Sequence, residues 1–154
     1  MPHHVGLDLG QSNDYSALAV IHDTFRENVR GERKKALDLV HLERFALRTS
    51  YVDIVNHVVG LLKDPVLHPW ETDGGPRRTQ THPTLIVDRT GVGSPVTDLF
   101  TKKRVRFVSV TITGGHSTNR GEGRQHYHVP KRDLVSALEV PFHSEELKVA
   151  EGLE

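Results

Sequence analysis

The chain has 154 residues, no cysteine, and equal numbers of basic and acidic side chains, with 20 Lys plus Arg against 20 Asp plus Glu. This length fits one domain that can bury a substantial core. The balanced charge excludes a global field that would drive binding to nucleic acids or membranes, so such contacts must come from local patches. The lack of cysteine excludes disulfides and thiolate metal sites, and no apolar run approaches the ~20 residues of a membrane span. We therefore expect a soluble, cytoplasmic protein.

Residues 5–21 predict a β-hairpin whose first strand carries a carboxylate. Apolar residues alternate around Asp8, turn-forming residues follow between Gly10 and Asp14, and a second apolar run comes after them. A charge inside a strand is costly to bury unless a cation or hydrogen-bond donors meet it. Asp14 falls in or just after the turn, where aspartate is common, so a structural role is favoured over ligation there.

The next segment is predicted to contain a third strand and a helix. A polar loop at 26–35 leads into an apolar-rich strand over 36–47, whose alternation slips once and so predicts a bulge near His41. Ser50 and the acid three residues later form a capping-box pattern. Valines and leucines at helical spacing after it predict an amphipathic helix over 51–63.

The second half of the chain alternates predicted strands and helices. After a long proline-rich loop at 64–83, residues 84–88 form an apolar strand that ends in Asp88. Ser94 and Pro95 predict the start of a short helix over 95–102 that faces inward with Val96, Leu99 and Phe100. A further strand is predicted over 105–112.

The last third is predicted to be mostly loop and helix. Residues 113–128 have no periodicity, so they predict a loop. Pro130 is expected to open a helix that faces inward with Leu134, Val135 and Leu138. The segment 144–154 is polar and capable of forming a helix.

The order of these elements predicts the fold. Three strands joined by short links favour antiparallel pairing, and two strands that each follow a helix favour parallel addition through right-handed crossovers. We expect an α/β domain with a five-stranded mixed sheet flanked by helices. This order resembles the ribonuclease H-like plan.

Asp8 and Asp88 are the predicted catalytic and metal-binding pair. If their strands are neighbours, both carboxylates lie at the same edge of the sheet, and such oxygen ligands suit Mg²⁺ or Mn²⁺. Two such cations ~4 Å apart can support phosphodiester hydrolysis. The alternative is that Asp8 caps a hairpin and Asp88 caps a turn.

Basic and histidine-rich residues near the C-terminus are weaker candidates. His126 and His128 have no third ligand at suitable spacing, so we interpret them as surface residues. Four basic residues could form a phosphate-binding rim for nucleic acid, although each could equally lie on a solvated surface. They are Arg120, Arg124, Lys131 and Arg132.

Three segments resemble the nuclease domain of phage terminase large subunits. Residues 6–17 (GLDLGQSNDYSA) resemble its opening strand and turn, 86–93 (IVDRTGVG) its second acidic strand, and 129–135 (VPKRDLV) the segment before its last helices. The resemblance runs from residue 5 to about 150. It implies a ribonuclease H-like domain that cuts concatemeric double-stranded DNA with two Mg²⁺ or Mn²⁺ ions in an infected host cell. It also implies a terminase ATPase domain, and a small subunit or portal, as partners.

The resemblance carries over for Asp8 and Asp88, which match the family's first two metal-binding acids. Its third acid, in a His-Asp-Asp-like motif near the C-terminus, has no counterpart here, and neither has the Walker A motif of the packaging ATPase. We therefore expect residues 1–154 to form one domain that lacks its C-terminal end, with full activity only in a longer parent chain. Glu145, Glu146 and Glu151 could replace the third acid, although a solvated helix face is favoured for them.

Two other functions stay open from the sequence. Residues 8–12 (DLGQS) also resemble the first phosphate loop of actin, Hsp70 and sugar-kinase-like ATPases, of which this chain would be a fragment. The missing third acid is compatible with a non-catalytic ribonuclease H-like module that binds nucleic acid or a protein.

Overall fold

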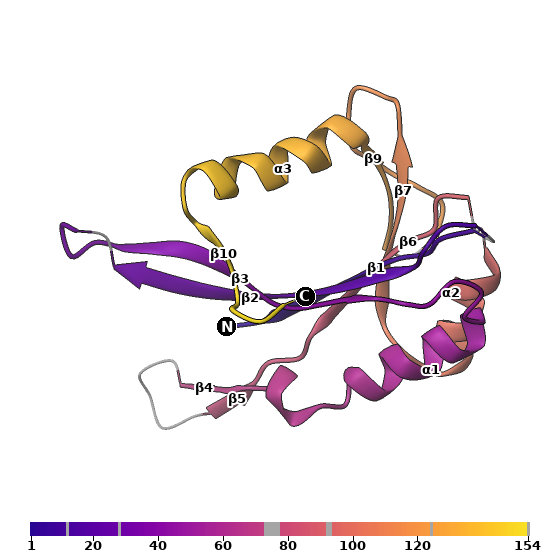
Figure 1. Cartoon of the computed structure of the whole chain (residues 1–154), viewed down its shortest axis with the longest axis horizontal. Coiled ribbons are helices and arrows are strands. Elements are labelled where there is room, and N and C mark those ends of the chain that lie inside the picture. Colours follow the sequence, from indigo (N-terminus) through magenta and orange to yellow (C-terminus); the bar gives the residue numbers. More distant parts are fainter. Residues whose placement is uncertain (12, 28, 73–77, 92–93, 124, 154) are drawn as a thin grey trace.

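The computed structural model describes residues 1–11, 13–27, 29–72, 78–91, 94–123 and 125–153 (Figure 1). Within these residues, eight strands form one mixed sheet in the order β10-β3-β2-β1-β6-β7-β9-β8. The strands are β1 (His3–Asp8), β2 (Ala17–Glu27), β3 (Arg33–Arg44), β6 (Thr84–Asp88), β7 (Phe107–Thr113), β8 (Asn119–Arg120), β9 (His126–Pro130) and β10 (Leu147–Val149). The α/β class predicted from the sequence is confirmed.

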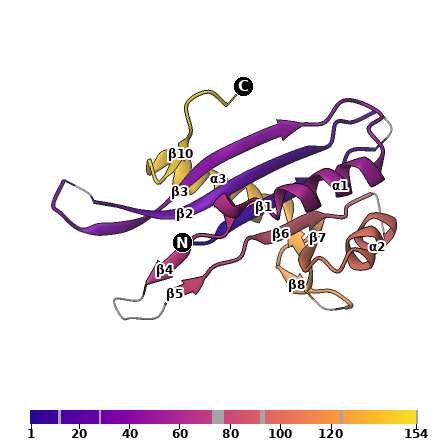
Figure 2. The same ribbon diagram turned by 90° about the horizontal axis from the view of Figure 1, so that it is seen from below.

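Helices cover both faces of this sheet. Figures 1 and 2 show α1 (Tyr51–Leu61) and α2 (Ser94–Lys102) side by side on one face, and α3 (Lys131–His143) across the other. None of the helices in the described ranges is long and apolar enough to cross a membrane.

The pairing of the first five predicted strands agrees with the expectation. β2 pairs antiparallel with both β1 and β3. β6 pairs in parallel with β1, and β7 pairs in parallel with β6. The predicted bulge is also confirmed, because Val20 pairs with His41 but Ile21 pairs with Leu39, which leaves Val40 as the extra residue.

The core lies between β1, β2 and β6 and the two helices α1 and α2. Ser50 is the N-cap of α1, and its Oγ accepts a hydrogen bond from the Asp53 backbone N–H, as the capping box predicts. Its apolar stripe packs on the odd-numbered residues of β1 and β6. Fully buried members are Val5, Val55, Val58, Leu85 and Val87. Each such side chain stabilises the fold by about 1.5–3 kcal/mol.

Helix α2 also faces this core as predicted. Val96 and Phe100 are buried, and Leu99 packs against the cluster from a partly buried position.

Several sequence predictions of loop or helix were wrong. The predicted five-stranded sheet has eight strands in the described residues. The 64–83 loop contains a 3-10 turn (η1, Pro65–Leu67) and a separate pair of strands, β4 (Trp70–Thr72) and β5 (Arg78–Gln80). Each strand of this pair has three residues, which is too short for polar and apolar alternation to show in the sequence.

The C-terminal third required the most correction. The predicted loop 113–128 contains β8 and the start of β9, and the predicted helix 144–154 contains β10 instead. β10 forms because the outer edge of β3 offers it backbone partners, as in the hydrogen bond from Leu37 N–H to the Glu146 carbonyl, 2.8 Å. The sequence around β10 does not indicate this pairing, because the partner strand β3 lies far away along the chain.

Helix α3 is placed as predicted along the chain but not in its packing. Leu134, Val135 and Leu138 were expected to face inward, yet all three are exposed, with 58% of Leu138 accessible. No residue of α3 is buried. The helix therefore lies across this face of the sheet without burying its own apolar side chains there.

His3 predicts how the stability of the fold depends on pH. Its Nδ1 atom is buried without a hydrogen-bond partner in the described structure, and its ring stacks on His22 with centroids 4.4 Å apart. Burial, and then the neighbouring His22, lower the pKa of His3 below its ordinary value of about 6.5. This residue's contribution to stability is present above about pH 6.5 and is lost as the pH falls through its lowered folded-state pKa.

We expect His3→Leu to raise the free energy of unfolding by about 1–2 kcal/mol near neutral pH, because it removes an unsatisfied buried polar atom. It should also reduce the fall of Tm between about pH 7 and about pH 5. Thermal unfolding followed by circular dichroism would measure both effects, with the exposed His116→Ala as control. An unchanged acid slope in His3→Leu would contradict this assignment.

Candidate functional site

The two predicted acids lie directly beside each other. Asp8 and Asp88 are register partners in the parallel pair of β1 and β6, at the last residue of each strand. Leu7 and Val87, one position earlier, are buried in the core. Because side chains alternate across a strand, both carboxylates project from the opposite face, on the side of α3. Their role as metal ligands stays a prediction.

This pair stands at a cavity of about 350 Å³ between the sheet and α3. Apart from Asp8 and Asp88, its walls are glycine and apolar side chains, including Ile86, Val110 and Leu134. Loss of solvent, followed by repulsion from Asp88, raises the pKa of Asp8 above its usual range. The raised pKa means that water and hydrogen-bond donors stabilise the charged form of Asp8 less in the folded protein than in solvent.

Asp88 is held by a chain of backbone contacts. Its Oδ1 accepts a hydrogen bond from the Thr90 N–H at 2.7 Å, which is an Asx-turn, and Thr90 Oγ1 accepts one from the Ile112 N–H at 2.7 Å. The turn-capping role weighed for Asp88 is therefore present. It also fixes the carboxylate beside Asp8.

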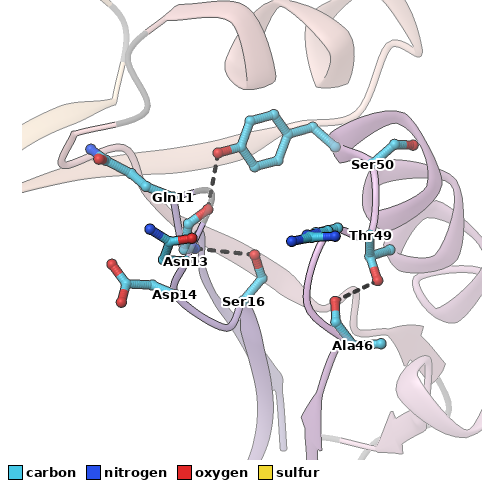
Figure 3. Close-up of a pocket in the computed structure, with 10 residues that line it drawn as sticks. Gln11, Asn13, Asp14, Ser16, Ala46, Thr49 and Ser50 are labelled. Carbon is cyan, nitrogen blue, oxygen red and sulfur yellow. Dashed lines mark hydrogen bonds between the residues drawn. The ribbon is translucent and has the colours of Figure 1, made fainter.

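The loop after Asp8 is folded back on itself by contacts to Gly10. The Gly10 N–H donates to Ser16 Oγ at 3.1 Å, and the Tyr51 hydroxyl donates to the Gly10 carbonyl at 2.9 Å (Figure 3). A Cβ at position 10 would lie 2.3 Å from the Asp14 carbonyl oxygen, so only glycine fits. This fold brings Asp14 close enough to contribute to the raised pKa of Asp8.

A further contact ties this loop to the loop after Asp88. The Gln11 side-chain amide donates to the Gly91 carbonyl at 3.0 Å, and Gly91 has the left-handed φ of 79° that favours glycine. The segments that follow both acids are therefore linked at one edge of the sheet.

The donor set fits one hard cation. Two adjacent carboxylates are suitable oxygen ligands for Mg²⁺ or Mn²⁺, and water can complete the shell. In the described part of the chain, no group of three or more His, Asp or Glu side chains is placed to hold a metal. The pair therefore fits a single cation better than two fixed ones.

The glutamates weighed as a third ligand lie elsewhere. Glu146 immediately precedes β10, which pairs with β3 at Leu37, and Leu37 pairs with Asp23 of β2. That part of β2 flanks the start of β1, about 16 Å from Asp8 at the usual strand rise. Glu145 lines a separate cavity there with Glu146, and Glu151 is exposed beyond β10. The helix predicted to carry them does not form.

The described basic residues predicted to contact nucleic acid lie on β8 and at the start of α3. Arg120 is exposed on β8 and pairs with Tyr127 of β9. Lys131 and Arg132 are exposed at the start of α3, where Arg132 donates to the His116 carbonyl and lies 3.4 Å from Asp133. Arg124 lies outside the described residues.

His126 was interpreted as a surface residue, and this was wrong. It is buried, its Nδ1 lies 2.9 Å from Ser109 Oγ, and desolvation lowers its pKa. A Cβ on Gly121 would lie 2.1 Å from the His126 ring, so the glycine in the preceding turn makes room for it. His128 is the half-buried partner of an edge-to-face contact with it, centroids 4.9 Å apart.

Comparison with protein-family models, with curated proteins and with solved structures found no match for this chain.

Sequence reasoning missed the residues that support the two acids. Gln11, Ser16 and Tyr51 act through contacts that span 80, 6 and 41 positions of the chain respectively. The only local signal was Gly10, which follows a strand and precedes polar turn residues. Pairing of Gln11 with Gly91 could be expected only after β1 and β6 were known to be neighbours.

The raised pKa of Asp8 predicts a stabilising substitution at the site. A carboxyl whose pKa is higher in the folded state contributes its stability below the unfolded pKa, and loses it as the pH rises through the folded pKa. Asp8→Asn should therefore raise Tm at about pH 7, and the gain should vanish towards about pH 3. Differential scanning calorimetry would test this, with Asp98→Asn, at an exposed position of α2, as control. A lower Tm for Asp8→Asn at neutral pH would show that the carboxylate is better satisfied than we conclude.

The close approach at Gly10 predicts a destabilising substitution. Gly10→Ala should lower the free energy of unfolding by about 1–3 kcal/mol, because the new methyl group collides with the Asp14 backbone. Gly6→Ala is a matched control, since a Cβ there meets nothing within 4 Å. Urea unfolding would measure both variants. Equal stability of the two would refute the required glycine at position 10.

Proposed function

We propose that this chain is a Mg²⁺- or Mn²⁺-dependent DNA endonuclease domain with a ribonuclease H-like fold, related to the nuclease domain of phage terminase large subunits. The observation that carries the proposal is the in-register pair of Asp8 and Asp88 at the ends of two central parallel strands. The order β3-β2-β1-β6-β7, with the first three strands antiparallel, supports the fold assignment.

The chemistry of the pair suits phosphodiester hydrolysis. A divalent cation bound there would supply charge stabilisation at the phosphate and lower the pKa of a bound water. Asp8 and Asp88 hold and orient the cation through carboxylate oxygens, and Thr90 fixes the direction of Asp88. Loss of solvent, and then repulsion from Asp88, raises the pKa of Asp8, and a bound cation would offset both effects.

The charge distribution bears on how a DNA substrate would be held. With no net charge, the chain would bind DNA through local basic residues, and its affinity would depend on salt. Arg120, Lys131 and Arg132 are exposed and could contact phosphates. As part of a packaging motor, the domain would act with a terminase ATPase domain and a small subunit or portal.

A non-catalytic role is the second candidate. The absence of a third acidic or histidine ligand from the described structure favours a module that binds nucleic acid or protein without cutting. Metal binding and cleavage distinguish the two functions.

Titration with Mn²⁺ in a calorimeter should show weak binding at one site in the wild type. Asp8→Asn and Asp88→Asn should each reduce the Mn²⁺ affinity by more than about 100-fold, because loss of a direct ligand costs more than loss of an outer-shell partner. Asp98→Asn should bind as the wild type does.

The same proteins should be compared in a plasmid-nicking assay with Mn²⁺ and with EDTA. We expect slow nicking by the wild type that EDTA and Asp8→Asn abolish. Equal cutting by wild type and Asp8→Asn would refute the assignment, whereas Mn²⁺ binding without cutting would support the non-catalytic module.

A further inference from the structure

A second cavity, of about 570 Å³, opens where the loop after β1 meets the start of α1 (Figure 3). Its walls are polar and come from segments that are distant in the sequence. The β1–β2 loop supplies Gln11, Asn13 and Ser16, and the segment before α1 supplies Arg48 and Thr49. None of these side chains belongs to the Asp8–Asp88 pair.

Arg48 is the cation in the wall of this cavity. Its backbone has a φ of 67°, in the left-handed region that side chains other than glycine rarely adopt. The turn is closed by Thr49, whose N–H and hydroxyl both donate to the Ala46 carbonyl. Within the described residues, the guanidinium of Arg48 forms no ion pair, hydrogen bond or ring contact. Arg48 is exposed and lines the cavity from a conformationally costly backbone position.

The acid that shares the cavity faces the other way. Figure 3 shows the Asp14 carboxylate directed away from Ser16 and Thr49. Asp14 instead contributes to the field at Asp8. Asp14 therefore adds to the negative charge around Asp8, whereas Arg48 lies in the segment before α1.

An exposed aromatic side chain belongs to the same loop but does not line the cavity. Tyr15 sits between the lining residues Asp14 and Ser16, is 45% exposed, and carries the Arg44 guanidinium 4.3 Å from its ring centroid. The charged residues among those that line the cavity are one cation, Arg48, and one acid, Asp14. Exposed aromatic and arginine side chains near such a cation are typical of sites that hold a nucleic-acid strand, because bases stack on the aromatic ring while cations meet the backbone.

We propose that this cavity binds a backbone phosphate of a nucleic-acid strand next to the Asp8–Asp88 pair, with Arg48 as the phosphate-binding cation and Tyr15 as a stacking surface. The inference rests on the proposed function and specifies how its substrate strand is held. Gly10 and Gln11 connect the two sites, since they line the cavity two and three residues after Asp8. Amide and hydroxyl groups of the wall can donate further hydrogen bonds to phosphate oxygens.

The test is the affinity for a short fluorescein-labelled single-stranded oligodeoxynucleotide, measured by anisotropy in EDTA at several salt concentrations. Arg48→Gly removes the cation while relieving the left-handed backbone, so the variant should be at least as thermally stable as the wild type. We expect it to bind about tenfold more weakly, with the slope of log affinity against log salt reduced by about 0.7. Arg48→Lys should retain most of the affinity.

Matched variants make the result specific. Lys63→Ala removes one exposed charge beyond the opposite end of α1 and should bind as the wild type does. Tyr15→Ala should weaken binding several-fold without changing the salt slope, because stacking releases no counterions. Inorganic phosphate should compete only weakly if a strand is the ligand.

The outcomes separate this inference from the proposed nuclease. Wild-type affinity in Arg48→Gly, or no oligonucleotide binding by the wild type, would overturn the phosphate site, while Mn²⁺ titration and nicking would still decide the nuclease. Arg48-dependent binding by a chain that never nicks DNA would support the phosphate site and reject the nuclease.

Discussion

The parallel pairing of β1 with β6 is the interaction on which the rest of the structure depends. It joins segments about 80 residues apart in a single register, in which Val5 meets Leu85, Leu7 meets Val87 and Asp8 meets Asp88. A slip by one residue would turn the acids into the core and the core residues towards α3. The apolar residues that pack against α1 and α2 therefore fix the register that also brings the carboxylates together.

That register has an electrostatic cost, which the surrounding loops offset in part. Loss of solvent at the apolar cavity, and then repulsion between the two carboxylates, raises the pKa of Asp8. The contacts of Gly10, Gln11 and Thr90 hold the strand ends together without neutralising either acid. Paired acids that cost stability are expected mainly at functional positions, because selection for stability alone would remove the charges.

The sequence predicted the parts of the fold that have a strong local signal. The hairpin around Asp8, the Ser50 capping box with its helix, and the apolar strand that ends in Asp88 all show clear periodicity, and the structure contains each of them. β8, β9 and β10 are short, and β10 pairs with the distant β3, so tertiary pairing decides their state. The same reason explains the site: Asp8 and Asp88 could be predicted from strand ends, but Gln11 and Tyr51 act through contacts set by the folded chain, and only the fold brings Arg48 to its cavity.

The topology also places the proposed site at one edge of the sheet. β1, β6, β7 and β9 run in the same direction, so their carboxyl ends share one edge of the sheet, where open α/β folds usually bind ligands. One register row crosses the sheet from Asp8 and Asp88 through Val110 and Tyr127 to Arg120, three strand spacings or about 14 Å from Asp88. Arg120 lies exposed along this row, and Arg48 lines the cavity beside the loop after β1. If the proposed metal site and the proposed phosphate site both hold, these two cations would offset the repulsion between the acids and the phosphates of a strand.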